Sequence, residues 1–190
     1  VHGFRFTSKT NPLKSFLFKT IEKILSFKTD IFITINNDDY NYAQFKLQKN
    51  KLCYKINGVG LDLKAKNFKK EISNKNRIKK ILVIAAYKKE KGYFEILKVA
   101  EMLKNKRIKI DCYGYGNYKK LNSIKIDKKL NNISFKKFDI NLDNKIKKYD
   151  IMLHLSQREG LPVSVMQSLS AGLPVICYNI RGNNDLIINK

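Results

Sequence analysis

The chain has 190 residues, and 43% of them are hydrophobic, so it can build a packed core and is not a wholly disordered protein. No run of apolar residues approaches the roughly 20 that a membrane-spanning helix needs, so the sequence predicts no such helix. The charge is extreme, because 39 Lys and Arg residues stand against 16 Asp and Glu residues and give a formal net charge of +23.

Two interpretations of this charge stay open. It would attract a polyanionic partner, either nucleic acid or an anionic membrane surface. Alternatively, a genome rich in A/T codons would raise Lys on every solvated face, as it would raise Asn and Ile, which are also abundant. We favour the second interpretation, with attraction to a membrane as a secondary effect. We expect no specific nucleic-acid partner, because Lys is spread along the chain rather than gathered in one patch.

The first part of the chain predicts a helix and two short strands. Residues 12–27 carry apolar side chains at helical spacing, with Lys on much of the remaining surface. Such a basic amphipathic helix could lie on an anionic bilayer, although packing on a sheet is the favoured interpretation. Residues 30–36 read as a strand, Asp38 as the N-cap of a helix that runs to about Asn50, and residues 51–57 as a second strand.

A polar, Lys-rich segment then separates this part from a more regular one, and it is the best candidate for a linker. We expect residues 1–62 to be the C-terminal part of one domain, residues 63–79 to be the linker, and residues 80–190 to be a second domain. Both domains look incomplete, and the chain starts with Val1 rather than Met. We therefore expect a fragment that is truncated at both ends.

Strands alternate with helices through the second domain, which predicts a doubly wound, Rossmann-like parallel sheet in an α/β fold. The expected strands are residues 80–87, 109–113, 133–138, 150–155 and 175–178. The expected helices are residues 93–106, 142–148 and a third that begins at Pro162. Ligands of such folds bind outside the carboxyl ends of the strands, where the polar motifs of this domain fall.

The three cysteines, Cys53, Cys112 and Cys177, each lie in an apolar, strand-like run and far from one another in the sequence. This pattern predicts three buried free thiols in a reducing cytoplasm. A metal site would need closer ligand spacing, and we expect no metal and no resident cofactor.

The most informative stretch is SQREGLPVSVMQSLSAGLPV, residues 156–175. Glu159 and Gly160 fill a loop before a helix that starts at Pro162, and Gly172 with Pro174 ends that helix. The free backbone N–H groups of a helix start bind anions, and a neighbouring carboxylate suits hydroxyl groups. Together they suggest a nucleotide-sugar ligand.

The same stretch resembles the retaining glycosyltransferases of family 4, which have the GT-B architecture of two Rossmann-like domains. Members carry a Glu, seven residues and a second Glu, embedded in the context EGLP…AGLPV. Glu159 with Gly160-Leu161-Pro162 matches the first Glu, whereas Gln167 stands at the second. The segment RGNNDL, residues 181–186, is similar to one found in polysaccharide-building members.

The resemblance implies a role for each matching position. Glu159 would contact hydroxyl groups of the donor sugar near the reacting carbon, and His2 in the segment His-Gly-Phe would face that sugar from the other domain. Gln167 would hold the ribose hydroxyls without the charge assistance that a Glu gives. Lys91 matches the lysine that neutralises the donor diphosphate.

Other positions bear on the same phosphates and on the base. The family usually has an Arg where this chain has Ala86, so the backbone N–H groups of the helix start would carry more of the phosphate contact. That start comprises Gly160, Leu161, Pro162 and Val163. Gly114 and Gly116 follow a predicted strand and would allow a close backbone approach to the nucleotide base.

The resemblance thus implies a hexosyltransferase that moves a sugar from a nucleoside-diphosphate donor, expected to be UDP-linked, to a lipid-linked glycan with retention of configuration. We expect it to serve surface-polysaccharide synthesis in the cytoplasm, peripherally bound to the inner face of the cell membrane. The alternative is a degenerate, non-catalytic nucleotide-binding fragment, because Gln167 and Ala86 depart from the family pattern.

Overall fold

The structure is a computed structural model that describes residues 3–7, 10–47, 52–58, 60–61 and 78–187. These residues divide into two compact units, and each is described by itself. The first unit comprises residues 1–60, 158–162 and 179–190, and the second comprises residues 61–157 and 163–178. Of the expected linker, only residues 78 and 79 fall within the described part of the chain.

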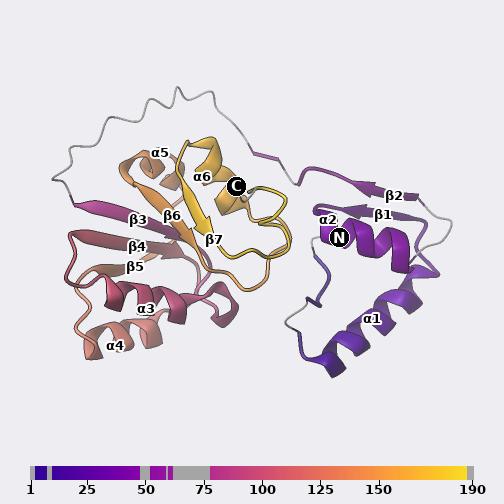
Figure 1. The fold of residues 1–190 in the computed structure, drawn as a ribbon, viewed down its shortest axis with the longest axis horizontal. Coiled ribbons are helices and arrows are strands. Elements are labelled where there is room, and N and C mark those ends of the chain that lie inside the picture. The colour runs from indigo at the N-terminus through magenta and orange to yellow at the C-terminus, as the bar shows by residue number, and fades with distance from the viewer. Residues whose placement is uncertain (1–2, 8–9, 48–51, 59, 62–77, 188–190) are drawn as a thin grey trace. The chain divides into compact units, whose positions relative to one another are not determined.

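The second unit is built on a five-stranded parallel sheet in the order β5-β4-β3-β6-β7 (Figure 1). Its strands are β3 Lys79–Ile84, β4 Ile108–Gly114, β5 Ile133–Lys137, β6 Ile151–His154 and β7 Val175–Cys177. The chain steps outward from β3 to β5 and then returns to place β6 on the other side of β3. The prediction of an α/β fold with a doubly wound parallel sheet is confirmed, and its topological switch point lies between β3 and β6.

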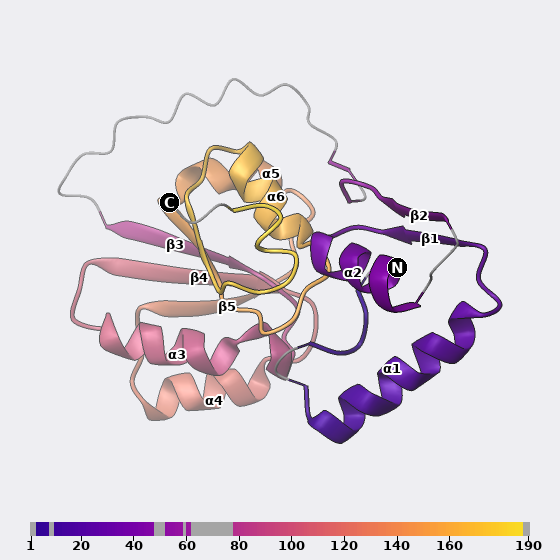
Figure 2. The same cartoon turned by 45° about the vertical axis from the view of Figure 1, so that its right-hand side comes forward.

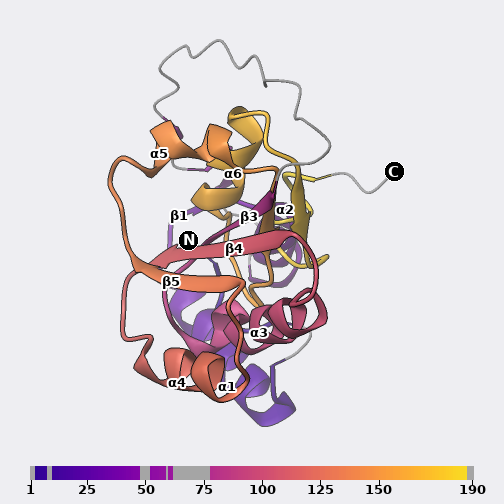
Figure 3. The same ribbon diagram turned by 90° about the vertical axis from the view of Figure 1, so that its left-hand side faces the viewer.

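Helices cover both faces of this sheet. The helices α3 and α4 lie on one face, and α5 and α6 lie on the other (Figure 3). Their bounds are α3 Tyr93–Met102, α4 Lys119–Asp127, α5 Leu142–Lys145 and α6 Val163–Ser170, with short 3₁₀ turns η2 Lys89–Lys91 and η3 Ile146–Lys148. The helix α4 was not predicted, because most of its residues are polar and only Leu121 is buried.

A hydrophobic core of the second unit lies between the sheet and α3. Val83, Ile110 and Cys112 of the strands pack against Ile96 and other buried side chains of the helix. Burial raises the pKa of the Cys112 thiol, so this thiol stays protonated in the fold. All three cysteines are free, but only Cys112 is fully buried, whereas the prediction had all three buried.

The opposite face of the sheet carries a polar network. The Asp111 carboxylate accepts a hydrogen bond from the Tyr149 hydroxyl at 2.9 Å and pairs with the Lys136 ammonium, also at 2.9 Å. The Tyr113 hydroxyl lies 3.2 Å from that of Tyr149 and accepts from Lys136 at 3.3 Å. Because Tyr149 is only 4% exposed, its hydroxyl would be costly to leave without this partner.

The first unit contains a two-stranded parallel sheet and two helices. Its elements are α1 Pro12–Ser26, β1 Ile31–Thr34, α2 Asn37–Tyr42, the π-helical turn η1 Ala43–Leu47 and β2 Leu52–Lys55. Phe4, Phe6, Phe32 and Ala43 form its buried core, and Phe18 of α1 packs against them. The prediction that Asp38 caps the second helix is wrong, because the side chain of Asn36 accepts the capping hydrogen bond.

Several predicted boundaries were also wrong. The strand expected over residues 80–87 ends at Ile84, and the helix expected over residues 93–106 ends at Met102. The helix expected to begin at Pro162 begins at Val163. The residues that follow β3 still form backbone hydrogen bonds with the end of β4 and the residues after it. Their apolar pattern therefore resembles that of a strand.

We predict that Tyr149→Phe lowers the free energy of unfolding by about 1–2 kcal/mol, because it leaves the buried side of Asp111 without its hydroxyl donor. Tyr115→Phe is the matched control, since Tyr115 is 63% exposed and its loss of a hydroxyl should cost less than about 0.5 kcal/mol. Urea unfolding of the two variants measures the difference, and equal stabilities would contradict the role of the network.

Candidate functional site

The turn that carries Lys91 is fixed to the end of β6 in the second unit. Gly92 has φ 75°, and a Cβ at this position would lie 2.0 Å from the carbonyl oxygen of Leu155. The backbone N–H of Gln157 donates to the carbonyl of Glu90 at 2.8 Å. The Ser156 hydroxyl donates to the same carbonyl at 3.3 Å. The backbone around Lys91 is therefore held at the carboxyl ends of β3 and β6, beside the switch point.

Gly114 lies at the carboxyl end of β4, where it touches the segment that follows β3. The backbone N–H of Ala85 donates to the carbonyl of Tyr113 at 3.1 Å, and that of Tyr87 donates to Tyr115 at 2.7 Å. A Cβ at Gly114 would lie 1.9 Å from the carbonyl oxygen of Ala85. The packing of the sheet therefore requires glycine at position 114. This requirement holds whether or not Gly114 also makes the predicted contact with a nucleotide base.

Gly116 follows two residues later and has φ 105°, in the left-handed region that favours glycine. A Cβ at this position would meet Tyr87 at 3.5 Å or more, which is ordinary contact. Glycine is thus required at Gly116 by backbone conformation and at Gly114 by close packing.

Helix α6 presents the position that resembles the ribose-binding Glu. Gln167 lies in the second turn of the helix and is half-buried. The helix starts at Val163, and Pro162 immediately before it has no N–H. Of the four backbone positions expected to contact phosphate, only Gly160, Leu161 and Val163 can therefore donate a hydrogen bond.

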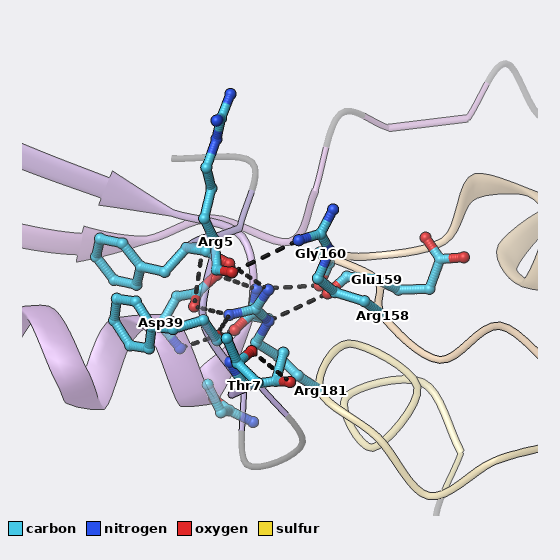
Figure 4. Close-up of polar contacts among 12 residues, drawn as sticks. Arg5, Thr7, Asp39, Arg158, Glu159, Gly160 and Arg181 are labelled. Atoms are coloured by element: carbon cyan, nitrogen blue, oxygen red, sulfur yellow. Dashed lines mark hydrogen bonds and ion pairs between the residues drawn. The ribbon is translucent and has the colours of Figure 1, made fainter. Parts of the chain in front are cut away.

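A buried arginine organises the loop of Glu159 in the first unit (Figure 4). Nε of Arg181 donates to the carbonyl of Glu159 at 3.1 Å. Its two Nη atoms donate to the carbonyls of Phe4 at 2.7 Å and Phe6 at 3.2 Å. Nη1 also pairs with the Asp39 carboxylate at 2.9 Å. The side chains of Arg181 and Asp39 are only 9% and 2% exposed, so the pair is shielded from solvent.

The residues around this pair fix the same loop from other directions. Nδ2 of Asn36 lies 3.0 Å from the carbonyl oxygen of Gly160 and 2.7 Å from Oδ2 of Asp39, and donates to both. A Cβ at Gly182 would lie 2.3 Å from that carbonyl oxygen of Gly160. The segment 181–186 therefore packs directly on the loop, which gives the RGNNDL sequence a structural function.

The arginine holds the main chain of Glu159 and leaves its carboxylate pointing elsewhere. Figure 4 shows the Glu159 side chain extending away from the Arg181 guanidinium, whose charge is already paired with Asp39. The loop of Glu159 thus has a backbone that this arginine fixes.

The predicted site residues fall into two groups. Lys91, Gly114, Gly116, Val163 and Gln167 belong to the second unit, and Glu159, Gly160, Leu161 and Pro162 belong to the first. His2 lies outside the described residues. No group of three metal-ligating side chains that could hold a metal ion is found within the described part of the chain.

In the sequence, Arg181 resembles the family only as part of the segment 181–186, and nothing there indicates a role for Asp39. The two residues are 142 positions apart, so no local spacing could have joined them. Asp39 also follows Asp38 in the first turn of α2, where acidic residues are common because they interact favourably with the helix dipole.

Comparisons with known proteins agree with the resemblance. Residues 64–190 match the family model described as Glycosyl transferases group 1. The chain is 27% identical over 202 residues to "Putative glycosyltransferase EpsD" of Bacillus subtilis (strain 168). This match covers 98% of this chain and 52% of that protein. It is 26% identical to "Uncharacterized 41.2 kDa protein in cps region" of Klebsiella pneumoniae, over 98% of this chain and 53% of that protein. The chain spans about half the length of these curated relatives.

Solved structures show the same fold. The pneumococcal O-GlcNAc transferase GtfA, in complex with UDP and GlcNAc, matches with a TM-score of 0.75 at 19% identity, over all of this chain and 38% of that one. Sucrose-phosphate synthase from Thermosynechococcus elongatus matches with a TM-score of 0.77 at 14% identity, over 98% of this chain and 51% of that one. The expectation of a GT-B-like fold is confirmed.

We predict that Arg181→Gln lowers the stability of the first unit by about 3 kcal/mol or more, because it leaves the Asp39 carboxylate buried and unpaired. Arg158→Gln is the matched control, since that exposed guanidinium donates to the carbonyl of Arg5 at 3.5 Å. Amide hydrogen exchange in α2 measures the effect, and exchange in β4 should not change. Equal protection of α2 in both variants would contradict the prediction.

We predict that Gly92→Ala costs about 3 kcal/mol, because the new Cβ would meet the Leu155 carbonyl in addition to the strain of a left-handed backbone. Gly172→Ala isolates that strain, since Gly172 has φ 67° and no atom within 4 Å of the added Cβ, and it should cost about 1 kcal/mol. Thermal unfolding compares the stabilities of the two variants. Equal losses of stability would show that the close approach to the Leu155 carbonyl does not matter.

Proposed function

Because the chain belongs to the glycosyl transferases group 1 family, we propose that the protein transfers a sugar from a UDP-linked donor to a glycan acceptor in polysaccharide synthesis. The observation that carries this proposal is the family match over residues 64–190, which includes Lys91 beside the switch point and the Glu159 loop. The names of the two curated relatives, a glycosyltransferase and a protein of a cps region, support the transferase and the polysaccharide. The UDP complex of the similar GtfA structure supports the nucleotide.

The donor diphosphate would be held at the carboxyl ends of the strands. The bond between the anomeric carbon and the β-phosphate oxygen breaks, so negative charge develops on the departing UDP. Lys91 supplies positive charge there, and the N–H groups of Gly160, Leu161 and Val163 supply dipoles. Because Ala86 stands where the family usually has an Arg, these groups carry the stabilisation with one cation fewer.

The acceptor hydroxyl would attack on the face from which UDP leaves, with retention of configuration. Its oxygen forms the new bond to the anomeric carbon, and its proton passes to the departing phosphate oxygen. Glu159 contacts the sugar hydroxyls near the reacting carbon, and His2 approaches the same sugar. Neither residue forms a covalent bond to the sugar in this proposal, which needs no metal ion and no resident cofactor.

The acceptor in this proposal is a lipid-linked glycan, which places the enzyme in the cytoplasm, peripherally bound to the inner face of the cell membrane. No helix within the described residues is long and apolar enough to cross a bilayer. The excess of basic residues, with a net charge of +23, favours contact with an anionic surface.

A second candidate function is that of a non-catalytic nucleotide-binding module. Gln167 and Ala86 favour it, because each removes a charge that the family uses to hold the donor. This module would bind UDP but would not hydrolyse or transfer the sugar of UDP-sugars.

We predict that the chain binds UDP in calorimetry, and that Gln167→Glu binds about tenfold more tightly, because a carboxylate accepts charge-assisted hydrogen bonds from both ribose hydroxyls. Lys91→Ala should weaken binding by about tenfold or more, whereas Lys89→Ala, in the same turn, is the matched control and should bind normally. No UDP binding by a folded sample would contradict the donor site. Binding without sugar transfer or hydrolysis would favour the non-catalytic module.

A further inference from the structure

We propose that Asn36 and Arg181 are positioning residues for the binding of the donor diphosphate. Each holds one of two successive backbone carbonyls, those of Glu159 and Gly160, and so directs the N–H group of the same peptide toward the phosphates. The N–H groups concerned are those of Gly160 and Leu161. The inference rests on the proposed function, which places these N–H groups at the departing UDP, and it adds the side chains that orient them.

Two neighbouring carbonyls of the loop are bound by side chains of the first unit. Nε of Arg181 donates to the carbonyl of Glu159 at 3.1 Å (Figure 4). Nδ2 of Asn36 donates to the next carbonyl, that of Gly160, at 3.0 Å. The Asp39 carboxylate joins the two donors, because Oδ1 accepts from Arg181 at 2.9 Å and Oδ2 accepts from Asn36 at 2.7 Å. Both carbonyls are therefore turned toward one cluster of side chains.

Peptide geometry then fixes where the N–H groups point. The peptide bonds of this loop are trans, and in a planar trans peptide the N–H points opposite to the C=O. The N–H of Gly160 shares its peptide with the Glu159 carbonyl, and the N–H of Leu161 shares its peptide with the Gly160 carbonyl. Both N–H groups therefore point away from the cluster. Successive N–H groups of a turn that share one side form a concave site for anions.

Burial makes this orientation lasting. Asn36 and Asp39 are 0% and 1% exposed, and the Arg181 side chain is 9% exposed, so water does not compete for their hydrogen bonds. Arg181 also carries a full charge. A hydrogen bond from a charged donor polarises the peptide that accepts it, which makes the N–H of Gly160 a stronger donor toward a phosphate.

Asn36 lies on a support that is itself held. It is the N-cap of α2, and Figure 2 shows β1 leading into this helix. Its side-chain oxygen accepts from the backbone N–H of Asp39 at 2.8 Å, while its nitrogen donates to Gly160. The next backbone N–H, that of Asn37, donates to Oδ1 of Asp185 at 2.8 Å. The side-chain amide of Asn36 is therefore oriented through both its oxygen and its nitrogen.

Calorimetry with UDP and with UMP tests the proposal on the 190-residue chain, because the two ligands differ only in the second phosphate. Asn36→Ser should weaken UDP binding about fivefold and change UMP binding less than about twofold, because Ser still caps α2 but lacks the amide that donates to Gly160. Asn37→Ser is the matched control, since its exposed side chain accepts from Lys55 at 2.8 Å. It should bind both ligands as the original chain does.

Nuclear magnetic resonance of the backbone amides observes the proposed hydrogen bonds directly. When the chain is saturated with UDP, the N–H resonances of Gly160 and Leu161 should move downfield. The shift of Leu161 should be smaller in Asn36→Ser and unchanged in Asn37→Ser. Because all samples are saturated, a loss of affinity or of stability would not by itself produce this difference.

A second variant reaches the same carbonyl and keeps the proposal testable if Asn36→Ser does not fold. Gly182→Ala places a Cβ 2.3 Å from the carbonyl oxygen of Gly160 and leaves Asn36 unchanged. Gly60→Ala is its control, because it strains a similar left-handed backbone and no atom lies within 4 Å of the added Cβ. Gly182→Ala should bind UDP about threefold or more weakly than Gly60→Ala.

The possible failures are distinguishable. Equal UDP affinities in Asn36→Ser and Asn37→Ser would overturn the proposal. Equal losses of UDP and UMP affinity would also overturn it, because they would indicate a role in folding alone. UDP binding that leaves the N–H resonances of Gly160 and Leu161 unmoved would show that these groups do not meet the phosphates. A folded original chain that binds neither nucleotide would instead contradict the donor site of the proposed function.

Discussion

The first unit depends on one buried cation. The Arg181 guanidinium is surrounded by three backbone carbonyls and the Asp39 carboxylate, so its charge is neutralised and four hydrogen bonds hold its plane. A lysine could not replace it, because a single ammonium lacks the planar, forked set of donors that reaches partners in several directions. Removal of either charge would leave the other buried and unpaired, which is far costlier than loss of an exposed ion pair. The pair therefore joins four segments that lie far apart in the sequence, around residues 4–6, 39, 159 and 181.

The second unit fixes its functional turns by a different means. Gly92 and Gly114 bring one backbone directly against another, at positions where any Cβ would collide with a carbonyl oxygen. These contacts join the segment after β3 to β6 on one side and to β4 on the other. The turn that carries Lys91 is therefore held through its backbone. The Arg181 cluster achieves the same for Glu159, whose main chain is bound while its carboxylate points away.

Charged groups serve two purposes in this chain. At the proposed donor site, Lys91 and a few backbone N–H groups would act on a small, strongly charged phosphate at close range, where each contact matters. In the sheet of the second unit, the Asp111 carboxylate pairs with the half-exposed Lys136 ammonium and accepts a hydrogen bond from the buried Tyr149, so a charge pair contributes to the packing there.

The sequence by itself determined the parallel α/β fold of the second unit and the family, because strand–helix alternation and the EGLP context are local patterns. It also placed Lys91 in a turn after a strand and Gln167 in a helix, and the structure has them in η2 and α6. It could not find the Arg181–Asp39 pair, because the partners lie 142 residues apart and only the folded chain brings them together. Nor could it decide which face of α1 is buried, because an amphipathic pattern identifies an apolar stripe but not what covers it. Tertiary packing decided one part of that, because it places Phe18 against the core of its unit.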